Sequence, residues 1–308
     1  TANDKRTENY ISYTPSADVT PIVTYGSKVT STSTVSSAAK ALEAQGYRVV
    51  AGINGDYYYT GSGIPMGLLV TDGVIRSGYN YTWAVGFMED GTVIMGDPKL
   101  SIKMSYTHTV TEPAPSDNSG ENGGETTGDS SLSDSAADSG SEQTVTREET
   151  VTKSIYTVNK ARDTSGIYLY TNDFNAKGTT GCTEAGVDVV LVPADGSANA
   201  DLRIGQTMTM TVESVTAKTG ATDVPAGKIV LSVNNKASAE NIKTLTDLKA
   251  GDTVTITVTP DAGYEVDQVN VTDKNGKEIP VKDLGRRSQK TCVDKYSCRK
   301  NQKSGSAF

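Results

Sequence analysis

The sequence predicts an α+β fold that is strand-rich, with mostly antiparallel sheets, two helices and an incomplete C-terminal end. Short apolar runs alternate with polar residues and are separated by Asp-Gly and other glycine-containing turns, which is typical of β-hairpins. Apolar residues at helical spacing occur in only two segments, residues 33–46 and 238–248. The predicted strands follow one another at moderate sequence distances, which favours antiparallel pairing.

The first helix is predicted over residues 33–46, with Ser33 or Thr34 as the N-cap and Gly46 as the terminating residue. It leads directly into the apolar run at residues 49–53, which we interpret as a buried strand. That strand stops at an Asn-Gly-Asp turn, residues 54–56, which three tyrosines follow. A buried strand that ends in a polar turn beside aromatic rings is a common way to hold polar groups at the rim of a cleft.

The next elements are predicted hairpins and strands. Asp72-Gly73 and Asp90-Gly91 each lie between two apolar runs, and such pairs supply the positive φ angles of tight turns. Residues 100–106 alternate between apolar and polar, and residues 151–158 form a matching strand beyond an acidic spacer. Further strands are predicted at residues 167–171, 187–192, 207–215, 229–233 and 253–259.

The acidic spacer covers residues 112–143, which contain eight Asp or Glu residues and no Lys or Arg. With one large apolar side chain it cannot repay its ordering entropy, so we expect a disordered insertion at the tip of a long hairpin. A calcium loop starting at Asp117 is disfavoured, since Asn122 stands where the loop needs glycine and no glutamate fills the twelfth position. The net charge of −8 and pI near 4.9 argue against a nucleic-acid partner.

Composition also indicates the setting of the protein. No apolar run approaches the roughly 18 residues of a membrane span, and no signal peptide is evident, although the sequence begins at Thr1 without methionine and is expected to have a processed or truncated end. The three cysteines, Cys182, Cys292 and Cys298, define neither a disulfide framework nor a zinc site. No metal or cofactor is therefore predicted. Threonine-rich strands with a Ser/Gly/Asp spacer are typical of bacterial cell-surface or extracellular proteins.

Several short sequence motifs, in a fixed order along the chain, resemble motifs of the phosphodiester glycosidase family. The motifs are YISYTP at 10–15, GINGDYY at 52–58, GIPMGLLVTDG at 63–73, AVGFMEDGT at 84–92, NKARDTSGIYLYTNDF at 159–174, GVDVVLV at 186–192, VPAGKIVLS at 224–232 and LKAGDTVTI at 248–256. Together they cover about 250 residues in family order, apart from the acidic spacer. The order makes the resemblance more specific than any single motif.

The resemblance implies hydrolysis of the bond between a sugar's anomeric carbon and a phosphodiester oxygen. Such a reaction passes through a sugar with oxocarbenium character and needs a carboxylate, together with donors that hold the departing phosphate. It implies Asp56 and Asn54 as catalytic residues. The residues implied in substrate binding are Gly55, Tyr57, Tyr58, Pro65, Gly67 and Thr180. Without the family context, an Asn-Gly-Asp turn is more often only a turn.

The C-terminal part departs from the family pattern. Two motifs that supply much of the family's active site do not occur in this sequence. They are an Arg-Thr-Ala motif and an Asn-Leu-Asp-Gly-Gly-Gly-Ser-like motif. Residues 251–281 instead resemble bacterial repeats of the internalin B type. We therefore expect a partial phosphodiester glycosidase domain at 1–256, a partial repeat-like β module at 251–284 and a basic disordered tail at 285–308.

The expected function is that of a glycosidase acting on sugar-1-phosphodiester bonds in extracellular glycans or cell-wall polymers, inactive in this truncated chain. The alternative is a non-catalytic β-rich protein that binds surface glycans or cell wall. Either function predicts a carbohydrate or sugar-phosphate polymer as the partner, with no nucleic acid and no membrane span. The sequence leaves the oligomeric state open.

Overall fold

The computed structural model of the protein describes residues 11–12, 19–78, 84–87, 93–96, 98, 100–113, 144–259, 264–265, 271–272, 278–279 and 299–300. The chain divides into two compact units. One is Thr107–Val151, and the other combines Thr1–Tyr106 with Thr152–Phe308.

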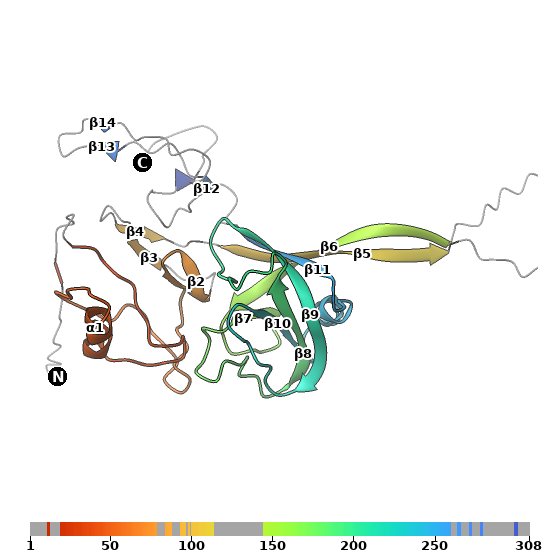
Figure 1. Cartoon of the computed structure of the whole chain (residues 1–308), viewed down its shortest axis with the longest axis horizontal. Coiled ribbons are helices and arrows are strands. Elements are labelled where there is room, and N and C mark those ends of the chain that lie inside the picture. The colour runs from red at the N-terminus through yellow and green to blue at the C-terminus, as the bar shows by residue number, and fades with distance from the viewer. Residues whose placement is uncertain are drawn as a thin grey trace, which may run out of the picture. The chain divides into compact units, whose positions relative to one another are not determined.

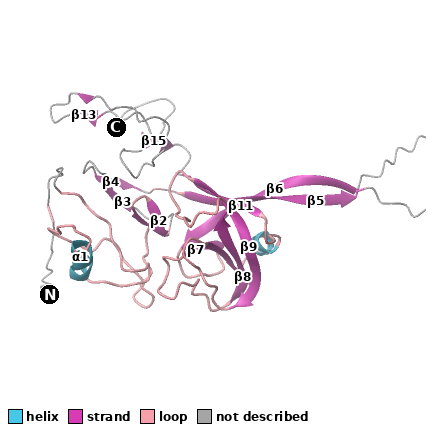
Figure 2. Cartoon of the chain, viewed as in Figure 1, coloured by secondary structure: helices cyan, strands magenta, loops and turns pink. Residues whose placement is uncertain are grey.

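The centre of the larger unit is a closed barrel of seven strands (Figures 1 and 2). Around the barrel the strand order is β10-β7-β6-β5-β11-β9-β8. The strands are β5 (Ser101–Pro113), β6 (Thr144–Val158), β7 (Ile167–Thr171), β8 (Ala185–Pro193), β9 (Thr207–Thr219), β10 (Ile229–Asn234) and β11 (Thr253–Thr259). The pair β6 and β7 is parallel, whereas β7–β10, β10–β8, β8–β9, β9–β11 and β11–β5 are antiparallel.

The closed barrel corrects the predicted fold class. The described residues form a nearly all-β fold with two short helices, not an α+β fold with open sheets. The prediction was wrong because sequence patterns locate strands but not the pairing that closes a sheet. Closure depends on β11 lying between β5 and β9, and β5 is about 150 residues away along the chain.

Alternating apolar side chains fill the barrel interior, as the two-residue period of a strand requires. Each strand contributes residues that are almost fully buried: Ile102, Met104 and Tyr106; Ile155; Ile167 and Leu169; Val187, Val189 and Leu191; Met210 and Val212; Ile229, Leu231 and Val233; Val254, Ile256 and Val258. Residues 253–259 contribute three buried side chains to this core as strand β11.

Strands β7 and β10 are buried on their outer face as well. Tyr168, Tyr170 and Val230 form a second apolar cluster there together with Ile64, Phe174, Cys182 and Val224. Tyr170 lies 5.2 Å from Phe174 between ring centroids, and its hydroxyl donates to the Lys160 carbonyl at 2.8 Å. The double burial accounts for the nearly continuous apolar runs of these two strands.

The two helices are short. Helix α1 (Val35–Glu43) is capped by Thr34, whose hydroxyl accepts from the Ser37 amide at 3.1 Å, but no residue of α1 is buried. Helix α2 (Ala239–Thr246) is capped by Ser238 and packs against β8 and β10 through Leu245. Both helices lie within the segments predicted from the sequence. No helix in the described residues is long and apolar enough to span a membrane.

Four pairs of short strands in the described residues lie outside the barrel, in the N-terminal half and beyond β11. They are β1 (Leu69–Thr71) with β2 (Val74–Ser77), β3 (Ala84–Phe87) with β4 (Val93–Gly96), and β13 (Val271–Thr272) with β14 (Glu278–Ile279); β12 (Tyr264–Glu265) also pairs with β15 (Arg299–Lys300). The Asp72-Gly73 turn joins β1 and β2 with positive φ at both residues, as its sequence predicts.

Strand β2 attaches the N-terminal half to the barrel. The Ile75 amide donates to the Leu202 carbonyl, and the Gly78 amide donates to the Val158 carbonyl, both at 2.8 Å. Arg76 forms an ion pair with Asp173 at 2.5 Å. Ile75 is buried, so this strand contributes an apolar anchor as well as hydrogen bonds.

The strand predicted at residues 49–53 is not formed. These residues are irregular, and Val50 and Ile53 are 68% and 63% exposed. The prediction was wrong because an apolar β-branched run shows that a segment can form a strand, whereas a strand also needs a neighbour to pair with.

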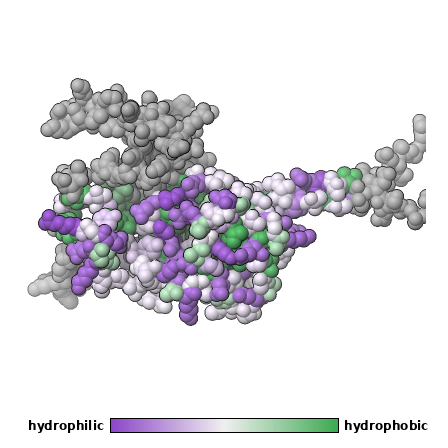
Figure 3. Space-filling model, in the orientation of Figure 1, coloured by the Kyte–Doolittle hydropathy of each residue, from purple (hydrophilic) through white to green (hydrophobic). Residues whose placement is uncertain are grey.

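In the view of Figure 3, apolar side chains are interspersed with polar ones over the described surface.

The smaller unit contains the outer parts of β5 and β6. Within it, Arg147 pairs with Glu112 at 3.1 Å, and the Thr107 and Thr150 hydroxyls lie 3.1 Å apart. Several predicted segments lie outside the described residues. They are residues 114–143 of the acidic spacer, the Asp90-Gly91 turn, most of the repeat-like segment and nearly all of the basic tail. The predictions made for them therefore remain predictions.

Candidate functional site

The predicted site residues Asn54 to Gly67 lie on one folded turn. Tyr58 and Pro65 form an isolated antiparallel bridge. On either side of it, the Tyr59 amide donates to the Ile64 carbonyl and the Met66 amide donates to the Tyr57 carbonyl, each at 2.9 Å. Residues 57–66 thus form a small hairpin, here called the tyrosine hairpin, and it brings Asp56 beside Gly67.

The Asp56 carboxylate is held by two backbone amides. Oδ1 accepts from the amide of Tyr57 at 2.7 Å, and Oδ2 accepts from the amide of Gly67 at 2.8 Å. A Cβ at position 67 would lie 2.9 Å from Asp56 Oδ2, closer than side-chain carbons approach oxygen, so only glycine leaves this contact undisturbed. Two amide donors fix the orientation of this exposed carboxylate.

Lys160, from the loop after β6, holds the same turn from the barrel side. Its ammonium donates to the carbonyls of Pro65, Met66 and Gly67, at 3.3 Å and 3.2 Å for the last two. Burial lowers the pKa of Lys160 to about 8, and the negative charge of Asp56 partly opposes this shift. A lysine from the barrel therefore meets the carboxylate turn that the sequence had singled out.

The exposed side of the tyrosine hairpin is aromatic. Tyr57 is 82% exposed, Tyr58 and Tyr59 are also exposed, and Asn54 and Gly55 lie on the same open segment. Ile64, by contrast, is buried in the cluster on the outer face of the barrel. The hairpin is therefore anchored by Ile64 and Lys160, and it presents tyrosine rings and one oriented carboxylate to solvent.

The tyrosine hairpin brings aromatic rings, a carboxylate and an amide side chain together on one exposed segment. Tyrosine rings stack on the apolar faces of sugar rings, while carboxylate and amide groups bind hydroxyls. Among the described residues, no group of three or more His, Cys, Asp and Glu side chains could hold a metal ion. The charge that interacts electrostatically with Asp56 is that of Lys160, whose pKa Asp56 raises.

Thr180 lies in a different environment from the other predicted site residues. It is 1% exposed; its amide donates to the Thr222 carbonyl at 2.8 Å, and its hydroxyl accepts from the Thr222 amide at 3.0 Å. The Thr222 hydroxyl in turn donates to Asp188. The structure thus places Thr180 in a buried polar network instead of on the tyrosine hairpin.

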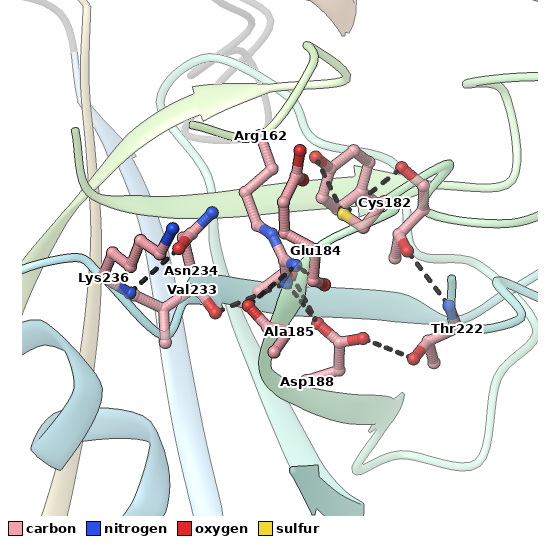
Figure 4. A network of polar contacts seen from close by, with 12 residues as sticks. Arg162, Cys182, Glu184, Ala185, Asp188, Thr222, Val233, Asn234 and Lys236 are labelled. Carbon is pink, nitrogen blue, oxygen red and sulfur yellow. Dashed lines mark hydrogen bonds and ion pairs between the residues drawn. The ribbon is translucent and has the colours of Figure 1, made fainter. Parts of the chain in front are cut away.

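The centre of this network is an ion pair between Arg162 and Asp188 (Figure 4). Their nearest charged atoms are 3.4 Å apart, and both side chains are almost completely buried. Ser232 donates to Asp188 and accepts from Arg162 Nη1 at 2.8 Å. Asp188 is the polar residue of an otherwise apolar strand, and the loop that carries Arg162 covers it on the outer face of β8.

Arg162 also ties together the ends of two strands. Nη2 donates to the Glu184 carbonyl at 2.7 Å, and Nη1 lies 3.4 Å from the Val233 carbonyl. A Cβ on Gly186 would lie 2.3 Å from Arg162 Nη1, so the guanidinium fits only because position 186 is glycine. Nε has no hydrogen-bond partner among the described residues. The many fixed contacts of the guanidinium indicate a structural role.

Cys182 is buried near the same loop and its thiol contacts the Tyr170 hydroxyl at 3.8 Å. It is a free cysteine. His108 lies on β5 in the smaller unit. Cys182 packs in the same buried cluster as Ile64 of the tyrosine hairpin.

A shallow cavity of about 370 Å³ lies at the start of β8 and the end of β9, beside α2. Its lining residues are Ala185, Gly186, Val187, Ala217, Lys218, Thr219, Asn235 and Ile242. None of the predicted site residues lines it.

Sequence reasoning missed Lys160 and the Arg162–Asp188 pair. Lys160 and Arg162 both lie in the motif NKARD, residues 159–163. This motif is part of the family resemblance but contains no catalytic pattern of its own. A signal for Arg162 was available, because an aspartate within the apolar run of β8 requires a buried partner. Lys160 offered no comparable signal, since its acceptors are backbone carbonyls more than 90 residues away.

No protein-family model and no curated protein matches this chain. Among solved structures, the chain is similar to the crystal structure of a hypothetical protein from Synechocystis, with a TM-score of 0.44 and 15% sequence identity. That similarity covers 78% of this chain and 33% of the other, so the chain spans about a third of the length of that protein.

Proposed function

We propose that this protein recognises a sugar-1-phosphodiester in an extracellular glycan or cell-wall polymer at the tyrosine hairpin, and that its chemistry is hydrolysis at the anomeric carbon. The observation that supports the proposal is the Asp56 carboxylate, oriented by the Tyr57 and Gly67 amides beside exposed tyrosine rings. The reaction class comes from the resemblance of the ordered sequence motifs to the phosphodiester glycosidase family.

In this mechanism each residue has a defined task. Tyr57 and Tyr58 stack on the sugar, and Asn54 donates to a hydroxyl or phosphate oxygen. The Asp56 carboxylate stabilises the positive charge that develops at the anomeric carbon as the bond to the phosphodiester oxygen breaks. Water then adds to that carbon, which leaves a free sugar and a phosphate monoester.

The test is turnover of synthetic methyl phosphodiesters of glucose and of N-acetylglucosamine at the anomeric position, followed by ³¹P NMR. Because the Arg-Thr-Ala and Asn-Leu-Asp-Gly-Gly-Gly-Ser-like motifs are absent, we expect no release of methyl phosphate by the chain itself. A version completed with the family's C-terminal part should release it, and Asp56→Asn in that version should lower the rate at least about 100-fold, in line with removal of a charge-stabilising group. Asp195→Asn, at an exposed turn, is the matched control and should keep full activity. Equal turnover by Asp56→Asn would contradict the assignment.

The second candidate is non-catalytic binding of glycan or cell wall. It is favoured by one observation: the charged side chain that contacts the Asp56 turn is the cation Lys160, through the carbonyls of residues 65–67, whereas glycoside hydrolysis ordinarily uses two carboxylates. This candidate predicts saturable binding to purified cell wall without release of a monoester. Tyr57→Ala should weaken that binding and leave the free energy of unfolding unchanged within about 0.5 kcal/mol, because the ring is exposed.

A further inference from the structure

The segment at residues 48–55, which follows α1, has unpaired backbone groups. No hydrogen bond joins its N–H or C=O groups to any residue within the described part of the chain. No residue of the segment has a positive φ. All of its residues are exposed except Val49, which is half-buried. An eight-residue run of this kind presents donors and acceptors along both edges.

The composition of the segment is that of a strand. Val49, Val50 and Ile53 are β-branched, and such residues favour pleated, paired backbone. Helix α1 does not cover the segment, since none of its residues is buried; the close contact between them is Gly52 against Val35. Unpaired strand backbone with apolar side chains is a template for adding a strand from another chain.

The apolar side chains of the segment are self-complementary about Ala51. If two copies lie antiparallel with Ala51 at the two-fold axis, Val49 of each lies opposite Ile53 of the other. Val50 then lies opposite Gly52, whose side-chain position faces Val35 of the same copy. Each copy thereby covers apolar surface that is exposed in the single chain.

The charges agree with the same register. Arg48 lies opposite Asn54, so no two like charges face each other across the pair. Arg48 is also diagonal to Asp56 of the other copy, within reach of a long side chain. Within the described residues Arg48 has no ion-pair partner of its own.

We propose that two copies of this chain form a symmetric dimer through antiparallel pairing of residues 48–54 about Ala51. The same patch serves both copies, as a two-fold interface requires. The pairing goes beyond the proposed glycan chemistry and does not depend on it. It would place the two tyrosine hairpins near opposite ends of one continuous two-stranded ribbon.

The experiment is sedimentation velocity of the full chain across a concentration series, with a pair of charge variants at the symmetry axis. Ala51→Lys places two ammonium groups opposite each other, and Ala51→Glu places two carboxylates opposite each other. We expect each variant alone to dimerise about tenfold more weakly than the unmodified chain, because like charges directly opposite in a sheet repel. An equimolar mixture should recover dimerisation, since the charges then attract.

Ala41→Lys is the matched control, because Ala41 is an exposed alanine of α1 outside the segment. It should dimerise as the unmodified chain does. A chain that stays monomeric at every concentration overturns the proposal. So does a dimer that Ala51→Lys and Ala51→Glu leave unchanged, and so do two monomeric variants that fail to associate when mixed.

Discussion

The Asp56 carboxylate and the Gly67 amide are joined by a hydrogen bond of 2.8 Å between residues eleven positions apart. That bond closes the base of the tyrosine hairpin, and Lys160 holds the Gly67 carbonyl on the other side of the same residue at 3.2 Å. Gly67 therefore links the exposed carboxylate to the barrel. The position of the carboxylate depends on a residue with no side chain of its own.

Gly67→Ala should destabilise the protein by about 1 kcal/mol. The added Cβ lies 2.9 Å from Asp56 Oδ2 and displaces the carboxylate from the amide that it accepts from. The measurement is the free energy of unfolding in urea. Gly55→Ala is the control, because a Cβ there has no atom within 4 Å. If Gly67→Ala and Gly55→Ala lowered the free energy of unfolding equally, the Asp56–Gly67 hydrogen bond would not be a stabilising contact.

Lys160→Met should loosen the tyrosine hairpin from the barrel. The ammonium donates to three successive carbonyls, and hydrogen bonds from a charged donor are worth about 1.5–3 kcal/mol each when one partner is removed. We expect faster hydrogen exchange of the Tyr59 and Met66 amides, with the strands of the barrel unchanged. Lys177→Met, at an exposed lysine, should change neither.

Stability should rise with pH through the titration of Lys160. Its pKa is about 8 in the folded protein, because burial disfavours the charged form, and near its usual 10.5 when unfolded. Between those values the unfolded chain binds more protons, so the free energy of unfolding increases by about 2 kcal/mol from pH 7.5 to 9.5. Below about pH 7 Lys160 is protonated in both states and this contribution is flat.

The measurement for that prediction is the difference between the unmodified chain and Lys160→Met over the same pH range. Taking the difference removes the contributions of the other titrating groups. Tyr168 and Tyr106 have raised pKa values from burial and titrate above this window. A difference that stays constant from pH 7.5 to 9.5 would refute the assignment to Lys160.

Arg162→Met should cost about 3–5 kcal/mol, because it leaves the Asp188 carboxylate buried without its cation. Adding Asp188→Asn should recover part of the loss, since the second change removes the unpaired charge. Denaturant unfolding of both variants provides the comparison. Arg147→Met is the control at an exposed ion pair, where we expect less than about 1 kcal/mol.

Local patterns in the sequence predicted individual elements well. The strands at 167–171 and 253–259 have the predicted bounds, and Thr34 caps α1 as its position indicated. Each of these features depends on neighbouring residues only. The strand predicted at 49–53 was wrong, because its apolar run signalled burial that no described partner provides.

The pairing of distant elements could not be predicted in the same way. Barrel closure needs Thr259 opposite Ser101, and the turn at Asp56 needs Lys160 from beyond β6. No periodicity or turn signal relates such positions. The turn itself was predictable as a place where Asn54 to Tyr58 and Gly67 gather, since it lies within a short span of sequence.

The order in which the barrel strands occur along the chain has a consequence for synthesis. Strand β5 emerges from the ribosome well before β11, its antiparallel neighbour, so the first strand of the barrel waits for the last one. Until then β5 and β9 each have an open edge that can pair with other chains. Contacts of such long sequence separation also form slowly. We therefore expect folding to be completed after most of the chain has been made, with a chaperone or low temperature improving the yield.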